Sequence, residues 1–277
     1  MPGRKRIRAG KVMLCLWSAA VFLFGLALLL YPSMNGLWVD YMLHRDAEAF
    51  LSFVHTDAYH PKEHASQTVV LPAGTGEQEE TLPEQYPELW QAMRDYNKAI
   101  CMEGQAGLSD PSAYETPSFT LADYGLDSEV FAVLTIPKLE MEMPIYLGAT
   151  KQHMADGAAQ MSQTSLPIGG PSTNCVIAGH RGWNGAAYFL HLPNLKAGDL
   201  VTITNLWEEL TYRVVETKVI RPNDVEAIHI QPNRHMITRI TTIRVIFRRA
   251  SYFRSSGSIS SWGWVCSTGW ATCSSSS

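Results

Sequence analysis

The stretch NCVIAGHRG, residues 174–182, shows most directly what the second half of this chain folds into. Its apolar run, residues 176–178, has the composition of a buried strand, and Gly179 and Gly182 surround His180 where that run ends. Glycines at a strand end leave room for an exposed imidazole in a defined position. His180 is therefore a candidate functional residue, and the alternative is that it is a structural or surface residue like most of the nine histidines.

Further short β-rich runs lie on both sides of this stretch, separated by Gly, Pro, Asn or Asp. Short strands with little helix between them predict a mostly β domain, either a barrel or a sandwich. Two short helical insertions are expected at residues 150–161 and 185–192. The runs are EVFAVLTIP (129–137), MPIYLG (143–148), DLVTITN (199–205), LTYRVVETKVI (210–220) and HMITRITTI (235–243).

The N-terminal part of the chain has helical patterns instead. Residues 12–30 are uncharged and almost entirely apolar, which suits a helix that spans a bilayer. Five basic residues within positions 1–11 predict that this end is cytoplasmic and that the rest of the chain is extracytoplasmic. A cleaved signal peptide is the alternative, since it also begins with basic and then apolar residues. Apolar spacing predicts two further helices, at residues 40–57 and 84–101.

Composition narrows the class of protein. Apolar residues make up 46% of the 277 positions, which excludes a fully disordered chain, and five scattered cysteines are too few for a disulfide framework. All 26 acidic residues lie between Asp40 and Glu226, a segment that holds only 11 basic residues. The acid-free start is explained by an anchor helix with a basic flank. The acid-free last 51 residues need a separate explanation.

Four segments have a recognisable pattern: LYPSMNGLW (30–38), LTIPKLEMEMPIYLGAT (134–150), TSLPIGGPSTN with VIAGHRG (164–174 and 176–182), and DVEAIHIQPNRHMIT (224–238). Together they resemble the class C sortases, the pilin-polymerising transpeptidases of Gram-positive bacteria. The resemblance implies an eight-stranded β-barrel that cleaves LPxTG-like sorting signals through a cysteine thioester and passes the product to an amine, usually a pilin lysine. The expected partners are therefore sorting-signal peptides, pilins or surface proteins and the membrane, with no cofactor, metal or nucleic acid.

The resemblance assigns catalytic roles to positions of this sequence. His180 lies in the position of the catalytic histidine, which acts as an acid or base. The family motif TLxTC corresponds to residues 238–242, so that Thr242 stands where the nucleophilic cysteine belongs. Threonine is a weak nucleophile without a dedicated base or an N-terminal amine. Arg249 is a weak candidate for the oxyanion arginine, and an ordinary solvated charge is the alternative.

The family's lid carries an Asp-Pro-aromatic motif, which Asp110 and Pro111 match here, with Tyr114 as the substitute aromatic residue. A bare Asp-Pro pair is also an ordinary turn signal. None of the chain's own cysteines is a convincing replacement for the nucleophile. Cys175 in particular precedes His180 by five residues on one strand, so the two side chains are not expected to face each other.

Residues 243–277 depart from the family pattern. They lack Lys, Asp, Glu, Pro and Asn, and serine fills 11 of the last 27 positions. A change of reading frame near residues 238–242 is one hypothesis, and drift in a true pseudo-enzyme is the other. Either predicts that the last barrel strand is disrupted. The expected divisions are a basic tail (1–11), an anchor (12–31), a helical region with the lid-like segment (32–128), the barrel (129–242) and an atypical tail (243–277).

Three functions remain open from the sequence. The first is a single-pass, membrane-anchored sortase-type cysteine transpeptidase, inactive as written because it lacks the nucleophilic cysteine. The second is a non-catalytic membrane-anchored module that binds sorting signals or pilin subunits. The third is an unrelated extracytoplasmic β-domain that matches the motifs by chance.

Overall fold

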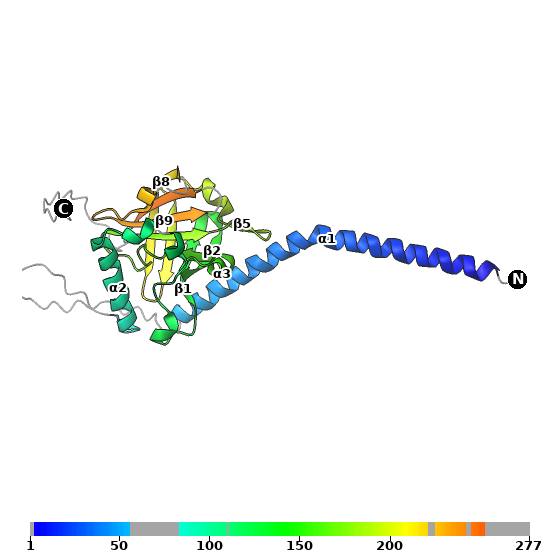
Figure 1. Cartoon of the computed structure of the whole chain (residues 1–277), viewed down its shortest axis with the longest axis horizontal. Helices are drawn as coiled ribbons and strands as arrows, with labels where there is room; N and C mark the ends of the chain where they lie inside the picture. The colour runs from blue at the N-terminus through cyan, green and yellow to red at the C-terminus, as the bar shows by residue number, and fades with distance from the viewer. Residues whose placement is uncertain (1–2, 56–82, 110, 221–224, 242–244, 253–277) are drawn as a thin grey trace, which may run out of the picture.

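A computed structural model describes residues 3–55, 83–109, 111–220, 225–241 and 245–252. Eight strands form a closed barrel in the order β1-β2-β3-β4-β9-β10-β8-β7 (Figure 1). The predicted mostly β, eight-stranded barrel is thereby confirmed. These strands are β1 (Val130–Ile136), β2 (Met141–Leu147), β3 (Ala158–Gln160), β4 (Thr173–Gly179), β7 (Leu200–Asn205), β8 (Glu209–Ile220), β9 (His235–Thr241) and β10 (Val245–Tyr252).

Two short strands, β5 (Arg181–Trp183) and β6 (Ala186–Tyr188), form a separate hairpin directly after β4. Where the sequence predicts a helix at residues 185–192, the structure therefore has a strand followed by the 3₁₀ helix η6 (Phe189–Asn194). The other helices are α1 (Gly3–Phe53), α2 (Pro87–Met102), α3 (Lys151–Asp156), η2 (Ala106–Ser109), η3 (Pro111–Tyr114), η4 (Leu121–Tyr124), η5 (Pro137–Leu139) and η7 (Val225–Ile228).

Helix α1 corrects the expectation of two separate N-terminal helices. It runs without interruption through Pro32, which cannot donate a hydrogen bond to the preceding turn and crowds it, so a bend is expected there. Figure 1 shows α1 bent, with its first half extending away from the barrel. The anchor and the following helix are thus one element.

The second half of α1 packs against the barrel. Leu43, Ala47, Phe50 and Val54 follow each other at intervals of three or four residues, and all are buried in the core that also contains the inner residues of β1 and β2. Burial of a large aliphatic or aromatic side chain contributes about 2 kcal/mol. This stripe therefore fixes α1 on the outer face of the barrel.

The last strand also corrects an expectation. Strand β10 is present, pairs with β8 from Val245 to Tyr252, and pairs with β9 over three positions. The barrel consequently extends past residue 242 and has no open edge at this point. The consecutive β-compatible residues Val245, Ile246 and Phe247 explain how an atypical sequence still supplies a strand.

Candidate functional site

The candidate site lies where two neighbouring parallel strands end. Strand β4 pairs with β9 in a register that places Gly179 opposite Thr241. The next residues along the chain are His180 and Thr242, so these two positions follow the same edge of the sheet. Thr242 itself lies outside the described residues. The tertiary structure therefore places the end of the strand that leads to Thr242 beside His180, although 61 residues separate the two in sequence.

Two aromatic side chains hold the His180 imidazole. Trp183 stacks on it with ring centroids 4.5 Å apart and planes 13° from parallel. Tyr188 approaches the same ring edge-on, with a centroid distance of 5.9 Å. The backbone is also tied, because the Phe189 N–H donates to the His180 carbonyl at 2.9 Å. Partial burial lowers the pKa of His180, which favours a neutral imidazole that can accept a proton.

The β5–β6 hairpin supplies both aromatic residues. Its turn is formed by Asn184 and Gly185, with φ values of 50° and 88°. Asn-Gly with positive φ at both positions is typical of the tight turn that matches the twist of a two-residue hairpin. Sequence reasoning missed the roles of Trp183 and Tyr188, although the Asn-Gly pair between two short β-compatible runs was the available signal.

An apolar surface lies on the outer side of β4. Cys175 and Ile177 face the main core, whereas Val176 and Ala178 belong to a second cluster, because alternate residues of a strand face opposite sides. Leu108 of η2 and Ile228 of η7 complete this second cluster, and Tyr114 packs against it. His180 continues the same alternation, so the apolar surface leads up to the imidazole.

The predicted lid residues lie beside this surface. Tyr114 ends η3 and donates a hydrogen bond from its hydroxyl to the Leu108 carbonyl. Its own carbonyl accepts from the Ala149 N–H at 2.9 Å. Pro111 begins η3, whereas Asp110 lies outside the described residues. The segment that contains Tyr114 therefore covers part of the outer face of β4.

Polar residues of the TSLP stretch brace β4 from the side. The Thr164 hydroxyl accepts from the Val176 N–H at 3.2 Å, and the Ser165 hydroxyl accepts from the Asn174 N–H at 3.0 Å. The buried Asn174 amide in turn donates to the Ile228 carbonyl at 2.7 Å and accepts from the Thr238 hydroxyl at 2.9 Å. These bonds fix the relative positions of β4 and β9, and hence of the two strand ends.

The structure separates every described cysteine from His180. Cys175 is buried in the barrel interior, and burial raises the pKa of its thiol far above the usual range, which disfavours the reactive thiolate. Cys101 is on α2 and Cys15 is on the exposed part of α1. Cys266 and Cys273 lie outside the described residues.

Arg249 lies in β10, opposite Thr238 of β9 and Glu216 of β8. Thr238 is four positions before Thr242, which corresponds to about 13 Å along a strand. The register therefore places the Arg249 backbone well away from the strand end beside His180. Among the described residues, no group of three or more His, Cys, Asp or Glu side chains has the arrangement of a metal site.

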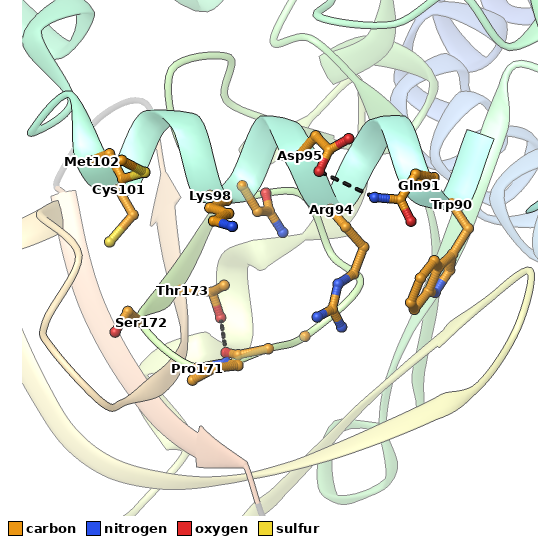
Figure 2. A pocket seen from close by; sticks show the side chains of 13 residues that line it. Trp90, Gln91, Arg94, Asp95, Lys98, Cys101, Met102, Pro171, Ser172 and Thr173 are labelled. Atoms are coloured by element: carbon orange, nitrogen blue, oxygen red, sulfur yellow. Dashed lines mark hydrogen bonds between the residues drawn. The ribbon is translucent and has the colours of Figure 1, made fainter. Parts of the chain in front are cut away.

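A pocket of about 500 Å³ opens at the other end of β4, between α2 and the loop 169–173 (Figure 2). Arg94 and Lys98 of α2 point toward this loop, while Asp95 turns away and accepts from Gln91. Thr173 begins β4 and His180 follows its end, so about 23 Å of strand separates the pocket from the imidazole. The pocket is therefore distinct from the candidate site.

Comparison with known proteins shows what the barrel region is similar to. Residues 134–246 match the family model described as a sortase domain. Among curated proteins, sortase A of Bacillus anthracis is 25% identical over 138 residues, 49% of this chain and 64% of the relative. Sortase A of Streptococcus agalactiae is 28% identical over 116 residues, 40% of this chain and 46% of the relative. The chain thus matches less than two thirds of the length of these relatives.

Solved structures give the same result for the fold. Sortase C-1 of Actinomyces oris is 27% identical with a TM-score of 0.54, covering 62% of this chain and 99% of that protein. Sortase C-1 of Streptococcus pneumoniae is 26% identical with a TM-score of 0.53, covering 63% and 93%. Sortase A of Corynebacterium diphtheriae is 26% identical with a TM-score of 0.55, covering 62% and 86%.

Proposed function

We propose that this chain, whose residues 134–246 match the sortase domain model and whose structural neighbours include class C sortases, is a membrane-anchored sortase-type protein. In this proposal it binds LPxTG-like sorting signals of pilins or surface proteins. The sortase relatives are cysteine transpeptidases, which join such proteins to an amine acceptor. In this chain Thr242 replaces the nucleophile, so the proposed outcome is binding without turnover.

The observation that carries the proposal is the apolar surface that leads to His180. Val176 and Ala178 present aliphatic groups on the outer face of β4, and the neutral imidazole follows at the strand end. An extended peptide with Leu and Pro side chains suits such a surface, because alternate residues of the peptide can be buried against it. Its scissile carbonyl would then lie near His180 and position 242.

The chemistry explains why the reaction stops at binding. In a sortase reaction the thiolate attacks the Thr carbonyl, the C–N bond breaks, and a histidine gives a proton to the leaving amine. His180 is available for the proton transfers. The Thr242 hydroxyl has no comparable anionic form at neutral pH, and no described cysteine reaches the site.

The segment that contains Pro111 and Tyr114 is proposed as a lid. It covers the same apolar surface that the peptide would occupy, because Tyr114 packs against the cluster formed by Leu108 and the outer residues of β4. Peptide binding would therefore require this segment to move. The proposal assigns Asp110 to the same lid.

Helix α1 is proposed as the membrane anchor of the chain. From Met13 it is long and apolar enough to cross a bilayer, and none of its most apolar window is buried against the barrel. The basic residues at positions 1–11 favour a cytoplasmic N-terminus, which places the barrel outside the membrane. The proposed divisions are tail (1–11), anchor (12–31), helical region (32–128) and a barrel that starts at residue 129. The expected barrel end at 242 is not kept, because β10 of the barrel lies within the atypical segment 243–277.

A second candidate function is that of an active transpeptidase whose cysteine and arginine are encoded in another reading frame. The acid-free, serine-rich sequence after residue 242 favours this candidate. Sequencing the coding DNA from codon 230 onward tests it. An alternative frame that reads TLxTC followed by an arginine would support it, and its absence from both alternative frames would exclude it.

Peptide binding tests the main proposal. The full chain in detergent micelles is titrated with a fluorescently labelled LPxTG-like peptide and with a scrambled peptide of equal composition. We expect saturable binding of the first peptide only, measured by fluorescence anisotropy, and no cleavage by mass spectrometry. Equal binding of both peptides would contradict the proposal, and a thioester on any native cysteine would contradict the claim of inactivity.

A further inference from the structure

The bend of α1 contacts the hairpin that holds His180. At this point helix and hairpin approach backbone to backbone: a Cβ atom added to Gly36 would lie 2.5 Å from the Gly185 carbonyl oxygen, and one added to Gly185 would lie 2.4 Å from the Pro32 carbonyl oxygen. The Asn35 amide also donates to the Asn184 carbonyl at 2.8 Å. The contact therefore includes a close approach of two glycines and one side-chain hydrogen bond.

The other side of the same hairpin holds the imidazole. Trp183 directly precedes the turn residue Asn184 and stacks on His180. Tyr188 at the end of the hairpin contacts the imidazole edge-on. The hairpin has only three residues in each strand and is not part of the barrel sheet. A two-stranded hairpin of this size is only marginally stable by itself, so its position depends on what it packs against.

We propose that α1, through Asn35 and Gly36, is a positioning element for His180: the helix supports the Asn184–Gly185 turn, and the hairpin transmits that support to the imidazole by the Trp183 stack. This inference rests on the proposed function only where it treats His180 as a catalytic-type residue. The coupling itself is a property of the fold.

The location of the contact connects the site to the anchor. Tyr31 is 68% exposed and belongs to the same run of exposed apolar side chains as the proposed anchor, whereas Gly36 is buried against the hairpin. The contact between α1 and the hairpin thus begins at Pro32, within one helical turn of the end of the proposed anchor (12–31). Because α1 continues through its bend without interruption, this contact links the position of His180 to the place where α1 would leave the membrane.

Two glycines of α1 give a matched pair of variants. Gly36→Ala adds a methyl group that cannot fit against the Gly185 backbone, whereas Gly25→Ala adds the same group where nothing lies within 4 Å. Both changes favour the helix itself to the same extent. Asn35→Ala is a second, milder perturbation, since it removes only the hydrogen bond to the hairpin.

The readout is the NMR signal of the His180 ring in the full chain in detergent micelles, identified by its loss in His180→Gln. The Trp183 stack gives this signal a ring-current shift. We expect Gly36→Ala to move the signal toward the position of an unstacked histidine and Asn35→Ala to move it in the same direction. Hairpin amides should exchange about fivefold faster in Asn35→Ala, the equivalent of one hydrogen bond.

Gly25→Ala is the control, and Asn35→Ala provides the outcome that can refute the inference. Gly25→Ala should leave both the His180 signal and hairpin exchange as in the unchanged chain. If Gly36→Ala fails to fold by circular dichroism, Asn35→Ala alone decides. An Asn35→Ala variant that matches Gly25→Ala in both measurements overturns the inference. Failure of peptide binding with the His180 coupling intact would instead remove only the proposed function.

Discussion

The most informative single substitution is Thr242→Cys. The register of β4 and β9 puts Gly179 opposite Thr241, so the next residues on each strand begin at the same edge. Neighbouring strands are about 4.8 Å apart, so we expect a cysteine at position 242 to lie within reach of the His180 imidazole. Under the proposed function, the substitution would restore the missing nucleophile beside the proposed acid–base group.

The expected reactivity follows from two pKa effects. An unperturbed thiol has a pKa of about 8.5, so roughly a tenth of it is thiolate at pH 7.5. Because burial lowers the pKa of His180, the imidazole is a weak proton acceptor and does not strongly favour a thiolate–imidazolium pair. We therefore expect alkylation of the Thr242→Cys variant to accelerate between pH 7.5 and 9.5 instead of reaching a plateau below pH 7. The buried Cys175 should react at least about a thousandfold more slowly, because it requires unfolding.

The assay uses an LPxTG-like peptide in which a chloromethyl ketone replaces the scissile Thr–Gly amide, so that a thiolate displaces chloride and stays bound to the peptide. After incubation with the full-length variant, digestion and mass spectrometry locate the adduct. We expect modification at position 242 in Thr242→Cys and none in Thr242→Ser, which has a hydroxyl in the same place. Labelling by iodoacetamide shows that the new cysteine is accessible. If the LPxTG-like reagent then labels it no faster than a chloromethyl ketone of scrambled sequence, the placement of the peptide beside His180 is wrong.

Three other perturbations test different parts of the structure. Tyr114→Ala removes the hydrogen bond that ties η3 to η2. If this segment is a lid, the apparent Kd for the sorting-signal peptide should fall about fivefold. Weaker binding would show that Tyr114 contacts the peptide instead. Asn174→Ala leaves two buried polar partners unsatisfied and should lower the free energy of unfolding by about 3 kcal/mol in urea denaturation, against less than about 0.5 kcal/mol for the exposed Gln152→Ala. The lowered pKa of His180 means that the unfolded chain binds the proton more readily, so stability should decline as pH falls below about 6.5, and His180→Gln should weaken this dependence.

Much of the barrel was predictable because its signals are local. The six β-rich runs in the sequence correspond to β1, β2, β4, β7, β8 and β9, since alternating or continuous apolar residues between turn residues need no distant partner to be recognised. The helical stripe that includes Leu43, Ala47 and Phe50 was predictable for the same reason. The continuity of α1 through Pro32 was not, because proline usually ends a helical pattern and only packing of the following turns retains it here.

The sequence by itself determined the chemistry of this protein. It placed a histidine after a glycine at a strand end, put threonine where the resemblance expects a cysteine, and supplied an apolar segment (12–30) long enough to span a bilayer; each is visible without any contact. Only the tertiary structure decided the arrangement. It brought the end of β9 beside His180, turned Cys175 into the barrel, stacked Trp183 on the imidazole, and set the bend of α1 against the turn of the hairpin that carries Trp183. The physical reason is that these relations depend on sheet register and close packing between segments far apart in sequence, which no local pattern encodes.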